Sequence, residues 1–302
     1  MNLGPQRSFP QLSTILLTFM LVSCCAVCAD AATWTVHAGP GQLVNGVPVL
    51  FQVKAPTKLE SLTGTWLKHP LIFSYDASKK TWFCLAGVSL ETAPGTYPLE
   101  LTGGRDGGKA PVTFTRALRV VRGEYPRIKA ALSVDSKFTA PTPEEEKEIA
   151  EGKKIKDDYL NRVTADREWR GNFAAPVQAE ISDVFGSERI FNNGTNSSPH
   201  LGLDFRVPSG TPVAAMNDGT VLLARPLYFE GGFVVIDHGQ GLLTLYLHLS
   251  EFKVKEGDTV KRGQEIALSG GTGRATGPHL HVAVRWEGTY LDPSRLLKMT
   301  LP

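Results

Sequence analysis

Cysteine is scarce in this sequence of 302 residues, which contains four cysteines in all. Three of them, Cys24, Cys25 and Cys28, lie close together near the N-terminus. If that segment is a leader that is removed, Cys84 is left alone and no internal disulfide can form. Cys84 lies in the apolar run Thr81–Leu85, so we expect it to pack in a core rather than to react.

Charge of one sign is also missing, because 32 basic residues stand against 30 acidic ones and the formal net charge is +2. A nearly neutral chain has no basic field that would attract nucleic acid, so we predict no nucleic-acid partner. With 42% hydrophobic and 21% charged residues, the composition is that of an ordinary globular protein. Charge therefore excludes one class of partner without identifying another.

An apolar run long enough to span a bilayer is lacking as well. The stretch Leu12–Val27 falls short of the roughly 20 residues that a spanning helix needs. Arg7 precedes it and the small residues Ala29 and Ala31 follow, which is the layout of a secretory signal. We predict a signal peptide over residues 1–31, export to the periplasm or cell envelope, and no transmembrane span after cleavage.

Two other interpretations of this leader stay open. Residues 21–24, Leu-Val-Ser-Cys, resemble a lipobox, which would leave a lipid anchor at Cys24. The leader could also stay in place as an uncleaved transmembrane anchor.

Beyond the leader, the pattern predicts a mainly β protein in two domains joined by a helical linker. Short strands punctuated by turn residues indicate an Ig-like β-sandwich over residues 32–125. We expect its strands at Leu43–Val53, Leu71–Tyr75, Thr81–Leu85, Tyr97–Leu101 and Val112–Val121. A second all-β domain is predicted over residues 173–302. We expect its strands at Thr211–Ala215, Thr220–Ala224, Phe233–Ile236, Leu242–Leu247, Gln264–Leu268 and Leu280–Val284.

The linker, residues 126–172, contains the signal for a helix start. Thr142 is a good N-cap, Pro143 suits the first helical position, and Glu145 completes a capping box. Apolar residues then recur at helical spacing among charged ones, which predicts an amphipathic helix that runs to about Trp169 and braces the two domains.

The C-terminal domain holds five of the seven histidines, and two of them are His279 and His281. In a strand, residues two apart share a face, so both imidazoles project to one side while Leu280 and Val282 face the other. Two histidines opposite an apolar stripe indicate one shared site rather than a pair of core residues.

A second candidate element is the segment from His200 to Asp204. A fully extended strand would separate these two residues by about 13 Å, too far for one metal ion. We therefore expect the chain to bend near His200, where Pro199 and Gly202 make a bend inexpensive.

The third element is Leu245–Leu249, in which Tyr246 and His248 alternate with leucines and are expected to share one face. Together the three segments supply four histidines and one aspartate. That inventory fits a catalytic zinc site with three protein ligands and an open fourth position, although the residues alone do not exclude another transition metal. No His-Glu-x-x-His helix is present in the sequence, so a thermolysin-like glutamate base is not expected.

These motifs, in this order, resemble the signatures of the lysostaphin-type zinc metallopeptidase family, over about residues 173–297. The matching segments are Pro199–Asp204, Tyr246–Leu249 and Gly270–His281. The sandwich and helical linker are similar to the N-terminal extension of some Gram-negative members.

The resemblance implies a Zn²⁺ ion held by His200, Asp204 and His281, with His248 and His279 flanking the attacking water. It implies an endopeptidase that hydrolyses peptide cross-links of peptidoglycan, whose stem peptides are the expected partner. Relatives of this type favour a D-alanyl endopeptidase, and lysostaphin-like glycine-bridge cleavage is the other possibility. By the same likeness, His238 in a turn is read as structural.

Two further interpretations compete with the enzyme. A catalytically inactive relative would act as a binding or activator module for another cell-wall hydrolase, but such modules usually lack ligands that are all present here. The segment Val254–Gln264 also resembles hairpins of biotinyl and lipoyl carrier domains, yet the chain has no Met-Lys-Met turn.

Overall fold

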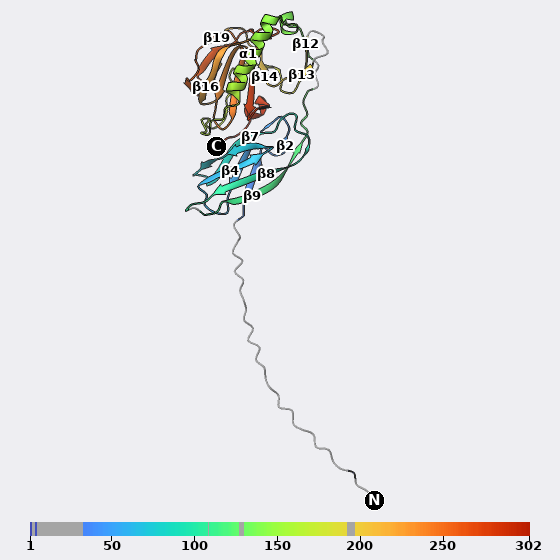
Figure 1. Ribbon diagram of the computed structural model, residues 1–302, viewed down its shortest axis with the longest axis vertical. Coiled ribbons are helices and arrows are strands. Elements are labelled where there is room, and N and C mark those ends of the chain that lie inside the picture. Colours follow the sequence, from blue (N-terminus) through green and yellow to red (C-terminus); the bar gives the residue numbers. More distant parts are fainter. Residues whose placement is uncertain (2–3, 5–32, 108, 127–129, 192–196) are drawn as a thin grey trace. The chain divides into compact units, whose positions relative to one another are not determined.

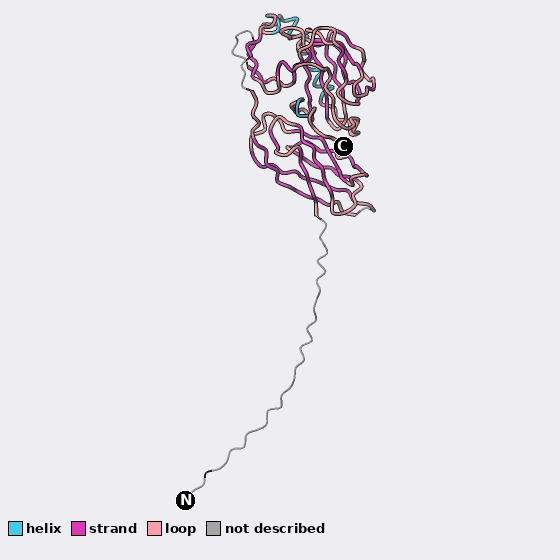
Figure 2. The backbone as a smooth tube through the Cα atoms, turned by 180° about the vertical axis from the view of Figure 1, so that it is seen from behind, coloured by secondary structure: helices cyan, strands magenta, loops and turns pink. Residues whose placement is uncertain are grey.

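The computed structural model describes residues 1, 4, 33–107, 109–126, 130–191 and 197–302. Apart from residues 1 and 4, the predicted signal peptide lies outside these residues, and so does the lipobox cysteine Cys24. Strands dominate both the N-terminal and the C-terminal parts of the described chain (Figure 2), which confirms the mainly β prediction.

The N-terminal part is built of two sheets, coloured blue to green in Figure 1. The first has the order β1 (Thr35–Gly39), β3 (Pro48–Lys54), β7 (Thr81–Gly87), β6 (Ser74–Asp76). The second has the order β2 (Leu43–Val44), β9 (Val112–Val121), β8 (Gly95–Gly104), β4 (Ser61–Trp66), β5 (His69–Ile72). Phe51 and Trp66 join the two sheets edge to face at 5.5 Å between ring centroids, so the sheets pack as a sandwich. Cys84 is buried in this core, as its apolar neighbours predict.

The connector contains a short 3₁₀ helix, η1 (Ser136–Phe138), and the helix α1 (Pro143–Leu160). The predicted start of α1 is confirmed, because the backbone N–H of Thr142 donates to Glu145 at 2.8 Å and the Thr142 side chain accepts from Glu145 N at 3.3 Å. The predicted end at Trp169 is wrong. Beyond Leu160 the chain is held by tertiary contacts, including Trp169, which packs edge to face on Phe83 at 5.9 Å.

The C-terminal part is organised around one large sheet. Its order is β11 (Ile181–Asp183), β14 (Leu203–Phe205), β22 (Leu280–Trp286), β18 (Leu242–Leu249), β17 (Gly231–Asp237), β16 (Gly219–Leu227), β20 (Thr259–Val260), with β23 (Thr289–Leu291) beside β22. A small sheet joins β15 (Pro212–Ala214), β21 (Glu265–Leu268) and β19 (Glu251–Phe252). A third joins β10 (Ala130–Leu132), β12 (Glu188–Phe191) and β13 (Ser197–Pro199), and α2 (Pro293–Leu296) lies near the C-terminus.

Alternation along the central strands gives the large sheet two apolar faces. Val234, Tyr246 and Val282 belong to the main core on one face. The other face presents a cluster that includes Leu245 and Ala283 together with Leu160 of α1. Helix α1 therefore covers this second face, where it contacts β16 and runs in front of the orange strands in Figure 1.

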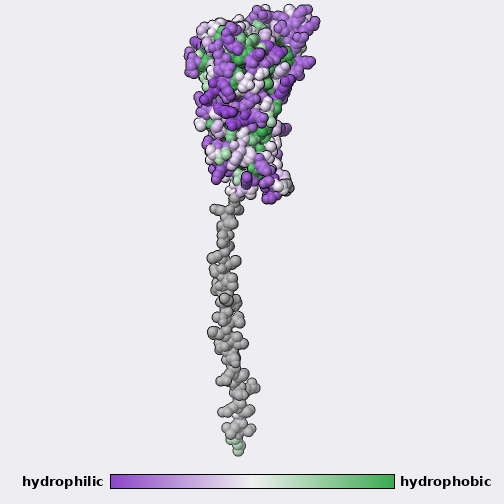
Figure 3. Space-filling model, turned by 90° about the vertical axis from the view of Figure 1, so that its left-hand side faces the viewer, coloured by the Kyte–Doolittle hydropathy of each residue, from purple (hydrophilic) through white to green (hydrophobic). Residues whose placement is uncertain are grey.

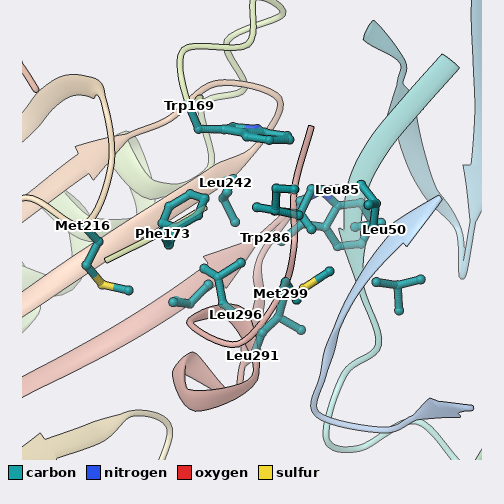
Figure 4. Close-up of a cluster of buried hydrophobic side chains, with 14 of the residues drawn as sticks. Leu50, Leu85, Trp169, Phe173, Met216, Leu242, Trp286, Leu291, Leu296 and Met299 are labelled. Carbon is teal, nitrogen blue, oxygen red and sulfur yellow. The ribbon is translucent and has the colours of Figure 1, made fainter. Parts of the chain in front are cut away.

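The main core runs without interruption from the sandwich into the C-terminal sheet. Leu50 and Leu85 of the sandwich belong to the same buried cluster as Trp286 and Leu291 (Figure 4). Gly87 is required at this junction, because a Cβ there would lie 2.5 Å from Leu291 Cδ2. The division into domains at residues 125 and 172 stays a prediction.

On the face shown in Figure 3, hydrophilic residues predominate and apolar residues are interspersed among them. Among the described residues, no helix combines the length and the apolar character that crossing a membrane requires.

Replacing Thr142 by alanine removes the oxygen that accepts from the Glu145 N–H. The free energy of unfolding should fall by about 1 kcal/mol, measured by urea unfolding followed by circular dichroism. Thr142→Ser keeps the hydroxyl and should unfold like the wild type. Equal stability of the alanine variant and the wild type would contradict the role of the cap.

Candidate metal centre

The centre of the site is a pair of residues on adjacent strands. Strands β14 and β22 are antiparallel, and their register sets Asp204 directly opposite His281. Cross-strand partners have Cβ atoms about 5 Å apart, which brings His281 Nδ1 to 2.8 Å from Asp204 Oδ1. Gly202 must be glycine, because a Cβ there would lie 2.5 Å from the His281 ring.

His200 reaches the same point from outside the sheet. It follows β13 directly and precedes β14, so the chain bends between them, as the sequence predicts. Its Nε2 lies 2.9 Å from His281 Nδ1 and 3.2 Å from Asp204 Oδ1. Its Nδ1 donates to the carbonyl of Val184 at 3.0 Å, which leaves Nε2 with a lone pair.

These three atoms fit a metal ion. Donors around a tetrahedral zinc with bonds near 2 Å lie about 3.3 Å apart, close to the distances observed here. Two imidazoles and one carboxylate are also the donor chemistry that zinc and related transition metals take. All three residues are buried and their donor atoms lie within 4.8 Å of one another. The ligand role of each residue stays a prediction.

Two more histidines lie beside the cluster. The ring centroid of His248 is 4.8 Å from that of His279 and 6.1 Å from that of His281. His248 Nδ1 donates to the carbonyl of Thr272 and His279 Nδ1 to that of Gly277, each at 2.8 Å. Because a carbonyl can only accept, the neutral ring carries its proton on Nδ1 and its lone pair on Nε2.

The glycine-rich loop between β21 and β22 holds the His248 ring in this orientation. Thr272 Oγ1 accepts from the N–H of Gly232 and donates to the carbonyl of Leu249, both at 2.8 Å. These bonds fix the Thr272 carbonyl that receives the His248 proton. Gly231, with φ of +64°, lets the loop approach, since a Cβ there would lie 2.3 Å from Thr272 Oγ1.

The prediction that Tyr246 and His248 share a face is wrong. Tyr246 is fully buried on the core face, where its hydroxyl accepts from Met216 N at 2.9 Å. His248 has a left-handed backbone with φ of +63°, and the β17–β18 register shifts between Gly232 and Val234. This irregularity breaks the alternation and turns His248 to the face of His281.

His238 lies away from this cluster. Its Nδ1 donates to the Asp218 carbonyl at 2.7 Å and its Nε2 lies 2.8 Å from Thr244 Oγ1. It is fully buried, so its structural interpretation agrees with its surroundings.

Electrostatics favour neutral imidazoles at His248 and His281 beside an ionised Asp204. Burial lowers the pKa of His281 to about 4, and burial with the neighbouring His281 lowers the pKa of His248 to about 3. Burial opposes ionisation of Asp204, but its side-chain contacts with His200 and His281 outweigh burial and hold the pKa of Asp204 far below its usual range. Asp204 is therefore ionised at neutral pH, beside the neutral rings of His248 and His281.

Sequence reasoning missed two polar residues behind the cluster, Arg189 and Asp183. The Arg189 guanidinium forms an ion pair with Asp204 Oδ2 and bonds Asp183 Oδ2 at 2.7 Å. Asp183 Oδ2 in turn lies 3.3 Å from His200 Nδ1. Neither residue follows a periodic pattern, and only the folded chain brings them together.

The cluster opens onto a cavity of about 290 Å³. His200, His248 and His281 line it together with apolar side chains and cationic ones. The apolar wall includes Phe229, Phe233, Leu245, Leu247, Ala283 and Tyr290, and the charged residues are Lys156, Arg189, Glu230 and Arg274.

A β-sheet domain that gathers two histidines and an aspartate beside two further histidines, at the mouth of a cavity, has the donor set of a single-metal hydrolytic site. Residues 198–293 match the sequence model of Peptidase family M23. The C-terminal part of the chain is therefore similar to the lysostaphin-type M23 metallopeptidases, as its motifs predict.

Similarity to known proteins extends beyond the matched domain. The chain is 34% identical over 252 residues to the peptidoglycan DD-endopeptidase ShyA of Vibrio cholerae. The aligned region covers 80% of this chain and 55% of ShyA. It is 41% identical over 125 residues to ShyB of the same organism, covering 41% of this chain and 27% of ShyB. The chain thus spans about half or less of the length of these relatives.

A solved structure from Pseudomonas aeruginosa, described as an M23 peptidase, matches with a TM-score of 0.64 and 27% identity. The match covers 84% of this chain and 95% of that structure, so the similarity extends well beyond residues 198–293.

Tyr246→Phe tests the corrected placement of Tyr246. Loss of the hydroxyl leaves the buried Met216 N–H without its acceptor and should lower the free energy of unfolding by about 1 to 3 kcal/mol. Zinc affinity should stay unchanged, and Tyr75→Phe, at an exposed tyrosine, is the matched control. Weaker zinc binding with unchanged stability would show that Tyr246 faces the metal centre instead.

Proposed function

We propose that this chain is an exported zinc endopeptidase that hydrolyses peptide cross-links of bacterial peptidoglycan. The observation that carries the proposal is the convergence of His200 Nε2, Asp204 Oδ1 and His281 Nδ1 at one buried point beside a cavity. The match to Peptidase family M23 and the names of the relatives agree with it.

Zinc is the metal we propose, with His200, Asp204 and His281 as its ligands. A bound zinc ion supplies Lewis-acid chemistry, because it polarises a peptide carbonyl and makes water more acidic. The donor set supports this choice, since neutral imidazole and carboxylate suit zinc better than calcium or magnesium. Three protein ligands leave one position for water or substrate.

His248 and His279 are the proposed catalytic residues. Each is held by an Nδ1–H bond to a loop carbonyl, so each offers an Nε2 lone pair in its neutral form. A lone pair at this position accepts a proton from the attacking water, and the protonated imidazole stabilises the negative charge that develops on the carbonyl oxygen. The imidazole then gives the proton to the leaving amine and becomes neutral again.

The proposed substrate is the direct cross-link between stem peptides, which makes the enzyme a D-alanyl endopeptidase. Support comes from ShyA and ShyB, both named as peptidoglycan DD-endopeptidases. The cavity suits such a substrate, because its apolar wall takes alkyl side chains. The predicted signal peptide would deliver the chain to the periplasm, with a lipid anchor at Cys24 as the alternative.

An inactive binding or activator module of the same family is the competing function. Such a module needs no metal ligands and no oriented imidazoles, whereas the chain has both sets together. This completeness supports an enzyme over a binding module.

Metal removal tests the proposal directly. The purified chain should release muropeptides from peptidoglycan sacculi, lose this activity after chelation, and regain it with zinc. Mass spectrometry of the products should show cleavage at D-alanyl cross-links. Full release by the metal-free protein would refute the zinc mechanism.

Single substitutions separate ligands from catalytic residues. His248→Ala should lower kcat about 10²- to 10⁴-fold while the protein still binds zinc, because a proton acceptor is lost and the ligands remain. Asp204→Ala should lose zinc itself, and His37→Ala, at an exposed histidine of the sandwich, should behave like the wild type. Loss of zinc from the His248 variant would move His248 into the ligand set.

A further inference from the structure

One ionic cluster lies behind two of the proposed ligands, Asp204 and His200. Arg189 on β12 donates from Nε and Nη2 to Asp183 Oδ2 at 2.9 and 2.7 Å. The same Nη2 also donates to Asp204 Oδ2, the oxygen that faces away from the histidines. One guanidinium thus bridges two carboxylates.

Asp183 is itself fully bonded. Its Oδ1 accepts from Ser187 Oγ at 2.7 Å and from Val184 N at 2.9 Å. Its Oδ2 receives Arg189 and lies 3.3 Å from His200 Nδ1. Asp183 therefore contacts one proposed ligand directly and the other through Arg189.

These bonds select which atoms face the metal position. With Oδ2 of Asp204 occupied by Arg189, Oδ1 is the oxygen turned to His200 and His281. With Nδ1 of His200 turned to Val184 and Asp183, Nε2 is the nitrogen turned inward. Partners behind the ligands fix ligand orientation, and their loss typically weakens metal binding about 10- to 100-fold.

Charge balance gives the bridge a second effect. The side chains of Arg189, Asp183 and Asp204 are 15%, 24% and 8% exposed, so solvent screens them weakly. Without the guanidinium, two poorly solvated carboxylates would face each other, and their repulsion would favour a displaced rotamer. An Asp204 side chain that has rotated away is a poor ligand.

We propose that Arg189 and Asp183 are positioning residues that hold Asp204 and His200 as single-atom ligands and thereby set the metal affinity of this centre. The inference rests on the proposed zinc site. It concerns metal binding alone, so it can be tested without peptidoglycan.

The experiment measures zinc affinity of the full chain by competition with a chromophoric chelator. Arg189→Gln and Asp183→Asn should bind zinc about 10- to 100-fold more weakly than the wild type. The zinc affinity of Arg189→Lys should lie between that of these two variants and that of the wild type, because lysine keeps the positive charge but cannot form the bidentate contact of the guanidinium. Arg206→Gln, at an exposed arginine two residues from Asp204, removes the same charge without these contacts and should bind zinc like the wild type.

Each alternative outcome has a distinct signature. Wild-type zinc affinity in both Arg189→Gln and Asp183→Asn would overturn the positioning role and leave the proposed function intact. The role is likewise overturned if the thermal midpoint of the metal-free variants falls while zinc affinity is unchanged, because the cluster is then merely structural. A raised KM with unchanged zinc affinity would assign Arg189 to substrate binding instead. A wild-type chain that binds no zinc would refute the proposed function itself.

Discussion

The pairing of Asp204 on β14 with His281 on β22 is the contact on which the rest of the site depends. It fixes two donor atoms 2.8 Å apart on a rigid sheet, where neighbouring backbone hydrogen bonds hold both strands in place. The remaining parts are arranged around this pair. The bend at His200 brings in a third donor, Gly202 leaves room for the His281 ring, and the glycine-rich loop orients His248 and His279.

Much of this site could be predicted from the sequence because strand periodicity is a local property. The spacing of His279 and His281, and the need for a bend at His200, follow from the two-residue period and the reach of one metal ion. The alternation rule failed at Tyr246 and His248, where a register shift and a left-handed residue break the period. Arg189 and Asp183 were not predicted, because only the folded chain brings them close to the ligands. Asp183 is placed there by the pairing of β11 with β14, and Arg189 by the position of β12.

In the fold, too, local features could be predicted and features that depend on tertiary contacts could not. The capping box of α1 involves only neighbouring residues, so the start of the helix was predictable. The end of the helix depends on tertiary contacts of the segment up to Trp169. Strands β1 and β4 were not among the predicted strands, and β4 alternates buried Leu62 and Trp66 with small polar residues. The connector also does more than join two parts. Its Lys156 forms an ion pair with Glu230, and both line the cavity beside the metal centre.

Crystals of the zinc-loaded chain offer the most direct test of the account. Anomalous diffraction at the zinc edge locates the ion independently of any assumption about its ligands. The account predicts one strong peak within about 2.3 Å of His200 Nε2, Asp204 Oδ1 and His281 Nδ1, with the fourth position open to the cavity. A peak elsewhere, or zinc bound without Asp204, would contradict it.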